Sequence, residues 1–175
     1  MDPNETEISV NEIAPGLWLG NQAASQSDKF INSKNIDAIV NCTKHIPNKF
    51  KGLAYLRIPV NDPGPASGVM NEDHKKMLEN LITALEFIDS HIKAGKNVLV
   101  HCHAGMQRSA TVVIYYLMCV SKIENIPAGR VSRKKLAQIK YRSTLSHVLA
   151  KRPIVYVYGI SNNFKPVFDY LIDSL

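Results

Sequence analysis

The stretch NVLVHCHAGMQRSATVV, residues 97–113, joins two apolar runs through a short polar loop. Residues 97–101 predict a buried strand, and residues 109–120 have the length and apolarity of a buried helix. Cys102 lies directly after the strand, between two histidines, and a glycine and an arginine follow it. The stretch therefore predicts a strand, a tight loop and the N-terminus of a helix within a few residues.

Strand-like and helix-like periods alternate along the rest of the chain. Short apolar or alternating segments predict three further strands, at residues 16–21, 36–43 and 53–60. Apolar residues spaced three or four apart predict helices, and turn-rich segments predict loops. The helices are expected at residues 21–35, 71–94, 134–150 and 163–175, and the loops at 61–68 and 121–133. This alternation is typical of the α/β class.

The bulk composition is that of a globular protein. Of the 175 residues, 45% are hydrophobic and 21% charged, and no apolar run approaches the roughly 18 residues of a membrane span. We expect a flexible segment over residues 1–10 and a single domain over residues 11–175. The N-terminus lacks the pattern of a signal peptide, and three cysteines do not suggest a disulfide framework. We therefore expect an intracellular, reducing location, either cytoplasmic or nuclear.

Positive charge is concentrated in one segment. The formal net charge is +6, and residues 121–152 contain nine Lys or Arg and one Glu, whereas the remainder is slightly acidic. Such a cluster is typical either of a surface that binds a phosphate-rich partner or of a solvated helix face. Six of these cations lie at or near the predicted helix: Arg130, Arg133, Lys134, Lys135, Lys140 and Arg142.

Three chemical roles are open to Cys102. A metal site is disfavoured because adjacent strand residues point to opposite faces, and the histidines elsewhere show no ligand spacing. A buried structural cysteine fits Cys42 and Cys119, which lie in apolar segments. It does not fit Cys102, which is followed by polar residues. A nucleophile is the role that accounts for those residues.

The loop after Cys102 explains how a nucleophile would work there. It leads into a helix N-terminus, where backbone N–H groups converge and favour an anion. Gly105 allows the backbone to curl, and Arg108 can fold back as a bidentate clamp on phosphate oxygens. The same electropositive cradle would stabilise a thiolate. One loop could therefore hold a phosphate and activate the sulfur beneath it.

The sequence VHCHAGMQRSATVVIYYLM resembles the signature of the dual-specificity protein phosphatases, within the cysteine-based tyrosine phosphatase superfamily. The segments GLWLGN, IDAIVNCT, YLRIPVND, FIDSHIKAGKNVLVHC and AKRPIVYVYG resemble family segments in the same order, over most of residues 11–175. The resemblance implies a tyrosine-phosphatase-like α/β fold, with helices flanking a central, mixed, twisted sheet. It implies hydrolysis of phosphotyrosine and phosphoserine or phosphothreonine through a phosphocysteine intermediate, with no metal and no other cofactor.

The resemblance also implies a role for each matching residue. Cys102 is the nucleophile, Ser109 hydrogen-bonds the sulfur and helps it leave, and His101 supports the loop from below. Asp62, in YLRIPVND, is the general acid. Arg108 stabilises the phosphate oxygens. The phosphate-binding residues are His103, Ala104, Gly105, Met106, Gln107 and Arg108.

Three features depart from the family pattern. Gln107 stands where relatives usually carry a serine. Asp62 lies 40 positions before Cys102, further than usual, which leaves Asp73 as a rival acid or as a favourable charge at a helix N-terminus. Residues 117–153 are longer than usual and contain a basic segment around 121–142, to which the family assigns no role. We expect the six cations named above to dock an acidic or phosphorylated partner near the active site.

Other functions use the same residues. An RNA 5′-triphosphatase or a phosphoinositide phosphatase would also need Cys102 and Arg108. Lipid-directed relatives tend to carry lysines in the loop and RNA-directed relatives a threonine in place of Ser109, so both are disfavoured. The basic segment keeps both alternatives, and with them a nucleic-acid partner, open. A non-catalytic phosphoprotein-binding module is disfavoured because the cysteine, the arginine and the acid are all present. A phosphorylated protein substrate is the principal expectation.

Overall fold

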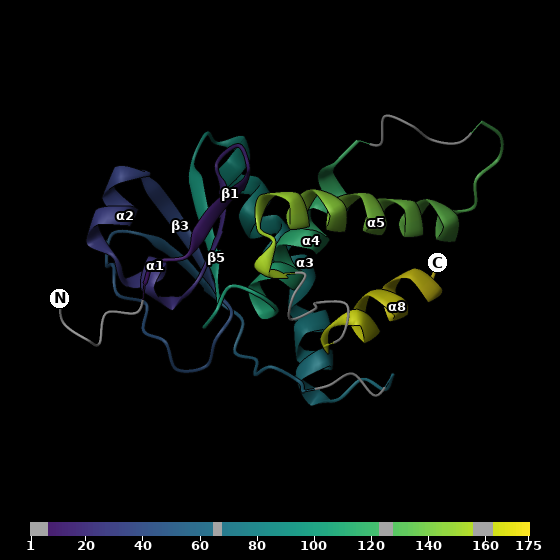
Figure 1. Cartoon of the computed structure of the whole chain (residues 1–175), viewed down its shortest axis with the longest axis horizontal. Helices are drawn as coiled ribbons and strands as arrows, with labels where there is room; N and C mark the ends of the chain where they lie inside the picture. The colour runs from purple at the N-terminus through teal and green to yellow at the C-terminus, as the bar shows by residue number, and fades with distance from the viewer. Residues whose placement is uncertain (1–6, 65–67, 123–127, 156–162) are drawn as a thin grey trace.

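The computed structural model describes residues 7–64, 68–122, 128–155 and 163–175. Among them, five strands form one sheet in the order β1-β2-β5-β3-β4, and helices cover both of its faces (Figure 1). The pair at the β1 edge is antiparallel and the other pairs are parallel, so the sheet is mixed. The predicted α/β class, with helices flanking a central mixed sheet, is confirmed.

The strands agree with the predicted segments except at the N-terminal edge. They are β1 Val10–Ala14, β2 Leu17–Gly20, β3 Ile36–Asn41, β4 Ala54–Arg57 and β5 Asn97–His101. β1 was not predicted, and it begins before the expected domain boundary at residue 11. The backbone N–H of Ser9 also donates to Oδ1 of Asn21, at 3.2 Å. The ordered domain therefore includes residues that were assigned to a flexible segment; residues 1–6 lie outside the described residues.

The predicted helix over residues 21–35 is two helices in the structure. They are α1 Gln22–Gln26 and α2 Asp28–Ser33. Ser27 between them is extended (φ −88°, ψ 109°), and its Oγ accepts the N–H of Phe30 at 3.1 Å. Serine competes well for this N-cap position, so the chain starts a second helix instead of continuing the first.

Four further helices complete the described fold: α3 Glu72–Lys93, α4 Arg108–Val120, α5 Arg133–Lys151 and α8 Lys165–Asp173. They lie on one side of the sheet, and α1 and α2 lie on the other (Figure 1). α3, α4, α5 and α8 match the predicted helices to within two residues at each end. The predicted loops continue into residues 65–67 and 123–127, which lie outside the described residues.

The sheet separates two apolar cores, and β5 contributes to both. Val98 and Val100 point into the larger core beneath α3, α4, α5 and α8, whereas Leu99 points into the smaller core beneath α2. This alternation follows from the two-residue period of a strand. All three side chains are fully buried. β5 is thus held on both faces, which gives a firm base to the loop that follows it.

The end of β5 lies level with the ends of its two parallel neighbours. His101 lies opposite Gly20 of β2 and Asn41 of β3. The segments that follow these strands therefore emerge at one edge of the sheet. In parallel sheets this carboxyl edge is where binding sites form, because the loops of several strands meet there.

Two cysteines were predicted to be buried in the core. Cys42 is fully buried, as predicted. Cys119 is exposed, so the prediction for it is wrong. α4 is apolar along most of its length, but Cys119 lies in its last turn, beyond the buried residues that end at Leu117.

Candidate active site

The loop between β5 and α4 wraps around the sulfur of Cys102. Sγ accepts the backbone N–H of Gly105 at 3.3 Å and the hydroxyl of Ser109 at 3.1 Å. Gly105 has a φ of +68°, in the left-handed region. A Cβ there would lie 2.5 Å from the carbonyl oxygen of Gly20. The curl predicted from the glycine is therefore present, and it needs glycine for two independent reasons.

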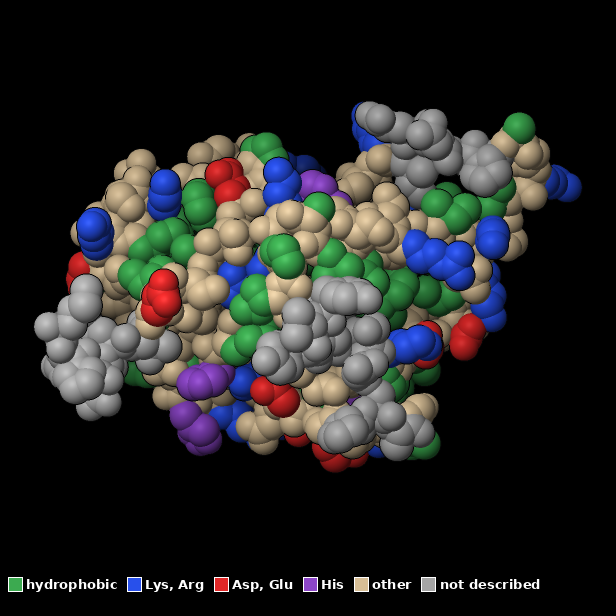
Figure 2. Space-filling model, viewed as in Figure 1, with side chains coloured by type: hydrophobic (Ala, Val, Ile, Leu, Met, Phe, Trp, Pro, Cys, Tyr) green, Lys and Arg blue, Asp and Glu red, His purple; other side chains and the backbone are tan. Residues whose placement is uncertain are grey.

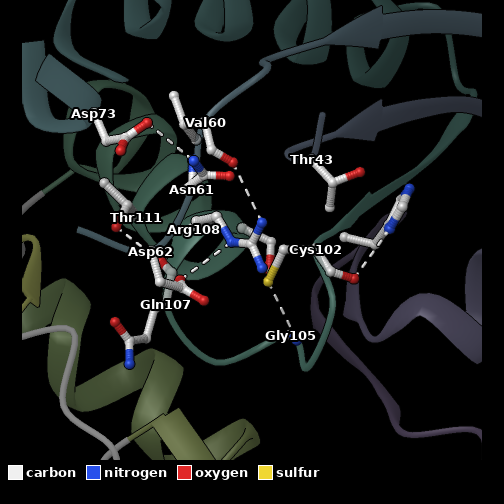
Figure 3. A network of polar contacts seen from close by, with 12 residues as sticks. Thr43, Val60, Asn61, Asp62, Asp73, Cys102, Gly105, Gln107, Arg108 and Thr111 are labelled. Atoms are coloured by element: carbon white, nitrogen blue, oxygen red, sulfur yellow. Dashed lines mark hydrogen bonds and ion pairs between the residues drawn. The ribbon is translucent and has the colours of Figure 1, made fainter. Parts of the chain in front are cut away.

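Arg108 opens α4 and lies between the sulfur and the segment that follows β4 (Figure 3). Its Nε lies 3.1 Å from Oδ1 of Asp62, and its Nη1 donates to the carbonyl oxygen of Val60 at 3.2 Å. The guanidinium is mostly buried, whereas about half of the Asp62 side chain is exposed. Arg108 therefore links the loop of the nucleophile to the loop of the predicted acid.

The first turn of α3 supports the Asp62 loop on both sides of the aspartate. The backbone N–H of Asn61 donates to Oδ1 of Asp73 at 3.0 Å (Figure 3). The side chain of Asn71, the N-cap of α3, donates to the carbonyl oxygen of Pro63, also at 3.0 Å. Asp73, the rival acid, is thus engaged by the backbone next to Asp62. Asp62 lines the pocket, whereas Asp73 accepts a hydrogen bond from the backbone beside it.

A pocket of about 120 Å³ opens above the sulfur. It is lined by Asp62, Cys102 and Arg108 and by four residues of the loop, His103, Ala104, Met106 and Gln107. α4 begins at this pocket, so its N-terminal end adds positive potential where an anion would lie. Gly105, Ser109 and His101 lie beneath the pocket and contact the sulfur or its neighbours. The predicted site residues therefore come together in one place.

The two histidines beside Cys102 differ in their surroundings. His103 is exposed, and its Nδ1 lies 3.1 Å from Oε1 of Gln22. His101 is buried, and its Nδ1 lies 3.2 Å from the carbonyl oxygen of Cys102. Burial is the main cause that lowers the pKa of His101 from 6.5 to about 4. His101 is therefore neutral near pH 7 and contacts the backbone at the start of the loop.

Cys42 does not compete with Cys102 as a nucleophile. Its backbone N–H donates to the carbonyl oxygen of His101, which places it at the end of β3 beside the site. Burial raises the pKa of the Cys42 thiol well above its usual value. A buried thiol of this kind is unreactive. Cys42 therefore packs against the base of the site as a small apolar side chain.

One buried side chain that contacts the loop was not predicted. Arg152, just after α5, donates from Nε to the carbonyl oxygen of Gly105 at 2.8 Å and from Nη2 to that of Ala104 at 3.1 Å. Arg152 lies in the segment AKRPIVYVYG, but neither its charge nor the resemblance of that segment assigned it a contact with the loop. Only the path of α5 across the sheet brings it to the loop.

The structure also bears on metal and membrane sites. Among the described residues, no three His, Cys, Asp or Glu side chains lie together in a way that could hold a metal ion. Within the same residues, no helix is long and apolar enough to cross a bilayer.

Residues 17–151 match the model of the dual specificity phosphatase catalytic domain. This chain belongs to that family. Human dual specificity protein phosphatase 1 is 35% identical to it over 115 residues, which are 65% of this chain and 29% of the human protein. Drosophila melanogaster dual specificity protein phosphatase Mpk3 is 37% identical over 119 residues, 66% of this chain and 26% of the fly protein. The chain thus spans less than a third of the length of these relatives.

The fold is also shared with solved structures. The Yvh1 phosphatase domain of Chaetomium thermophilum superposes with a TM-score of 0.71 at 22% sequence identity, and the match covers 95% of this chain and 96% of that one. The likeness in fold therefore extends well beyond the loop around Cys102.

We expect acid to destabilise the protein partly through His101. The unfolded chain takes up a proton near pH 6.5, whereas the folded chain resists it until about pH 4. Unfolding therefore binds a proton in this interval, and the free energy of unfolding should fall by up to about 3 kcal/mol as the pH drops from 6.5 to 4. Urea unfolding at several pH values measures this free energy. In His101→Gln the free energy of unfolding should change less between pH 6.5 and pH 4. The exposed His45→Gln variant controls for loss of an imidazole, and an equal slope in His101→Gln and wild type would contradict the prediction.

Proposed function

We propose that this chain is a dual-specificity protein phosphatase, which hydrolyses phosphotyrosine and phosphoserine or phosphothreonine in proteins through a phosphocysteine intermediate. The observation that carries the proposal is the placement of the Cys102 sulfur beneath a curled loop. Arg108 and Asp62 face the same pocket, 3.1 Å apart. The proposed nucleophile and anion clamp come from one loop, and the proposed acid comes from a distant part of the chain.

In the first step the Cys102 thiolate attacks the phosphorus, and the bond from phosphorus to the substrate oxygen breaks. Asp62 gives its proton to that leaving oxygen. The three remaining oxygens stay in the cradle of loop N–H groups, and the planar fork of Arg108 stabilises their charge. The product of this step is phosphocysteine and the free hydroxyl of the dephosphorylated residue.

In the second step water attacks the phosphocysteine. Asp62, now a carboxylate, accepts a proton from the water, and the bond from phosphorus to sulfur breaks. Sulfur leaves with the electron pair as a thiolate. The hydroxyl of Ser109, 3.1 Å from Sγ, donates to it and stabilises the leaving group. Inorganic phosphate is released and Cys102 returns to its starting form.

The pocket supports acceptance of both kinds of phosphorylated side chain. Among the described residues its lining is the loop and Asp62, and its volume is about 120 Å³. A site without a deeper wall would let the phosphate of a short threonine side chain reach the sulfur as well as that of a tyrosine. A deeper wall would hold only the longer side chain.

We expect the full chain to hydrolyse both phosphotyrosine and phosphothreonine peptides without added metal. This activity is measured as the release of inorganic phosphate from a panel of substrates: both peptides, a phosphoinositide and an RNA 5′-triphosphate. Cys102→Ser should abolish turnover on all of them but still bind the peptides, because serine is a poor nucleophile in the same cradle.

The other outcomes of this panel each identify a different function. Turnover of the lipid or the RNA with little on the peptides would replace the proposal by the corresponding alternative. Peptide binding without turnover in the wild type would favour a phosphoprotein-binding module.

We expect Asp62→Asn to slow peptide dephosphorylation by roughly 10²-fold to 10⁴-fold, the usual contribution of a positioned acid. The loss should be much smaller with an aryl phosphate whose leaving group needs no proton. Asp73→Asn is the matched control. Because the asparagine Oδ1 can still accept the N–H of Asn61, the rate of peptide dephosphorylation should fall far less in this variant. If the rate of peptide dephosphorylation fell more in Asp73→Asn than in Asp62→Asn, the assignment of the acid would be reversed.

The basic residues lie further from the pocket than the sequence suggested. α5 has 19 residues, so its first and last residues are about 27 Å apart at 1.5 Å per residue. The last turn leads to Arg152 and the loop, whereas Arg133, Lys134 and Lys135 are exposed in the first turn. The expectation of a cluster near the active site therefore does not hold for these three first-turn residues, whereas Arg142 lies only about 15 Å along the helix from Arg152.

The surface around α5 is nevertheless rich in cations. Figure 2 shows Lys and Arg side chains gathered over the part of the molecule where α5 lies in Figure 1. Lys134 is paired with Asp173 of α8 at 2.6 Å, but Arg133, Lys135 and Arg142 are in none of the ion pairs of the described residues. Cations in a first turn oppose the helix dipole, so folding gives little reason to place them there. We propose that this surface docks an acidic or phosphorylated part of a protein substrate, away from the phosphate that is removed.

We expect Arg133→Gln, Lys135→Gln and Arg142→Gln, combined, to lower kcat/KM for a phosphorylated protein but not for a small aryl phosphate. Lys134 is kept because of its ion pair with α8. The preference of the wild type for the protein substrate should also decline with salt, since charges are screened beyond about 8 Å at physiological ionic strength. The control combines Lys29→Gln, Lys51→Gln and Lys96→Gln, which removes three exposed charges elsewhere. Equal loss in both triple variants would contradict a docking surface on α5.

We also propose an intracellular, reducing location. The three cysteines Cys42, Cys102 and Cys119 are free thiols in the structure. A nucleophilic cysteine works only while it is reduced, and the cytoplasm and nucleus keep thiols in that state.

A further inference from the structure

Arg152 is a buried cation behind the phosphate loop. Its side chain is fully buried, and it is the largest such side chain among the described residues. None of the ion pairs found in those residues includes it. A buried arginine normally has a carboxylate beside it, because an unpaired charge is expensive to remove from water. The positive charge of Arg152 is therefore left for something other than an acidic side chain.

The partners of Arg152 are neutral oxygens, and two of them belong to the loop. Besides the carbonyl oxygens of Ala104 and Gly105, Nη1 donates to Oδ1 of Asn11 at 2.8 Å. Nη2 also lies 3.5 Å from the carbonyl oxygen of Ser9. Arg152 thus ties the loop to the start of β1.

These contacts determine which way the loop amides point. In a trans peptide the carbonyl of one residue and the N–H of the next point in opposite directions, and the described chain has no cis peptide. Because the carbonyls of Ala104 and Gly105 face Arg152, the N–H groups of Gly105 and Met106 face away from it. The N–H of Gly105 is indeed directed at Sγ of Cys102, at 3.3 Å.

The charge of Arg152 also reaches the sulfur. Burial is the larger influence and lowers the pKa of Arg152, whereas a negative Cys102 raises it. The arginine and the thiolate therefore stabilise each other across the loop, and a phosphate above the sulfur lies in the same field.

We propose that Arg152 is a positioning residue of the phosphate-binding loop. It holds two peptide groups with their N–H sides toward the bound phosphate, and its unpaired buried charge adds to the attraction of the pocket for a dianion. The proposal deepens the phosphatase function, because it explains why the loop keeps an anion-binding shape.

A purely structural arginine would have a different effect from a positioning one. A structural residue stabilises the fold, so its loss lowers the melting temperature and leaves the folded site unchanged. A positioning residue changes the affinity of the folded site for an oxyanion. Both properties can be measured separately on the full chain, with inorganic tungstate as the probe.

We expect Arg152→Met to weaken tungstate binding by roughly 10-fold to 100-fold, the range for loss of charge-assisted hydrogen bonds. kcat/KM for an aryl phosphate should fall by a similar factor. Arg152→Lys should have a tungstate affinity and a kcat/KM between those of the wild type and Arg152→Met, because lysine keeps the charge but lacks the planar fork that spans two carbonyls. Lys151→Gln, an exposed neighbour, is the control for a lost cation in the same turn.

A second variant keeps the test decisive if Arg152→Met does not fold. Asn11→Asp preserves the acceptor for Nη1 and places a carboxylate beside the guanidinium. It should leave the melting temperature equal or higher, yet weaken tungstate binding several-fold because the positive charge is offset. Wild-type tungstate affinity in both Asn11→Asp and Arg152→Lys would overturn the proposal. Wild-type chain that binds tungstate but hydrolyses no phosphoester would instead refute the phosphatase function and leave the role of Arg152 standing.

Discussion

The site depends on one backbone constraint: the chain must turn around the Cys102 sulfur with its N–H groups inward and its carbonyls outward. Gly105 meets the constraint by adopting a φ of +68°. The backbone of Gly20 closes one side of the turn and Arg152 takes the outward carbonyls. Buried carbonyls without donors would cost free energy, so the turn is stable only where the fold supplies those donors. The anion cradle is thus a property of the packed domain rather than of the loop alone.

The parallel part of the sheet brings the remaining components to the same edge. His101 lies opposite Gly20 and Asn41, so the segments after β2, β3 and β5 emerge together. Asp62, the proposed acid, lies on a loop that contacts the N-terminal turn of α3 and Arg108. A helix terminus has polar groups without intrahelical partners, and here they hydrogen-bond the loop on both sides of Asp62. The expanded loop after Asp62 is therefore anchored close to the aspartate.

α5 connects two regions that serve different purposes. Its C-terminal end supplies Arg152 to the phosphate loop, and its N-terminal end carries exposed cations about 27 Å away. The first-turn cations of the proposed docking surface are therefore far along the helix from the loop, and a partner that contacts both would have to span most of the length of α5. This separation suits a protein substrate better than a small phosphoester. The cations at the two ends of α5 therefore have different proposed functions: Arg152 positions the loop, and the exposed cations bind a partner.

The local sequence determined the strand, loop and helix around Cys102, because their apolar periods, the glycine and the arginine all lie within 17 residues. It also identified Asp62, through its resemblance to a family segment. It did not reveal β1, whose pairing is set by β2, or the break at Ser27, where a cap outweighs helix continuity. Nor did it assign Asp73 its contact with the backbone beside Asp62, or distinguish Arg152 from Lys151 as the cation that contacts the loop. Those distinctions depend on hydrogen bonds between residues far apart in the chain, such as Arg152 with Gly105 and Asn11, which only the packing of α5 across the sheet brings within reach.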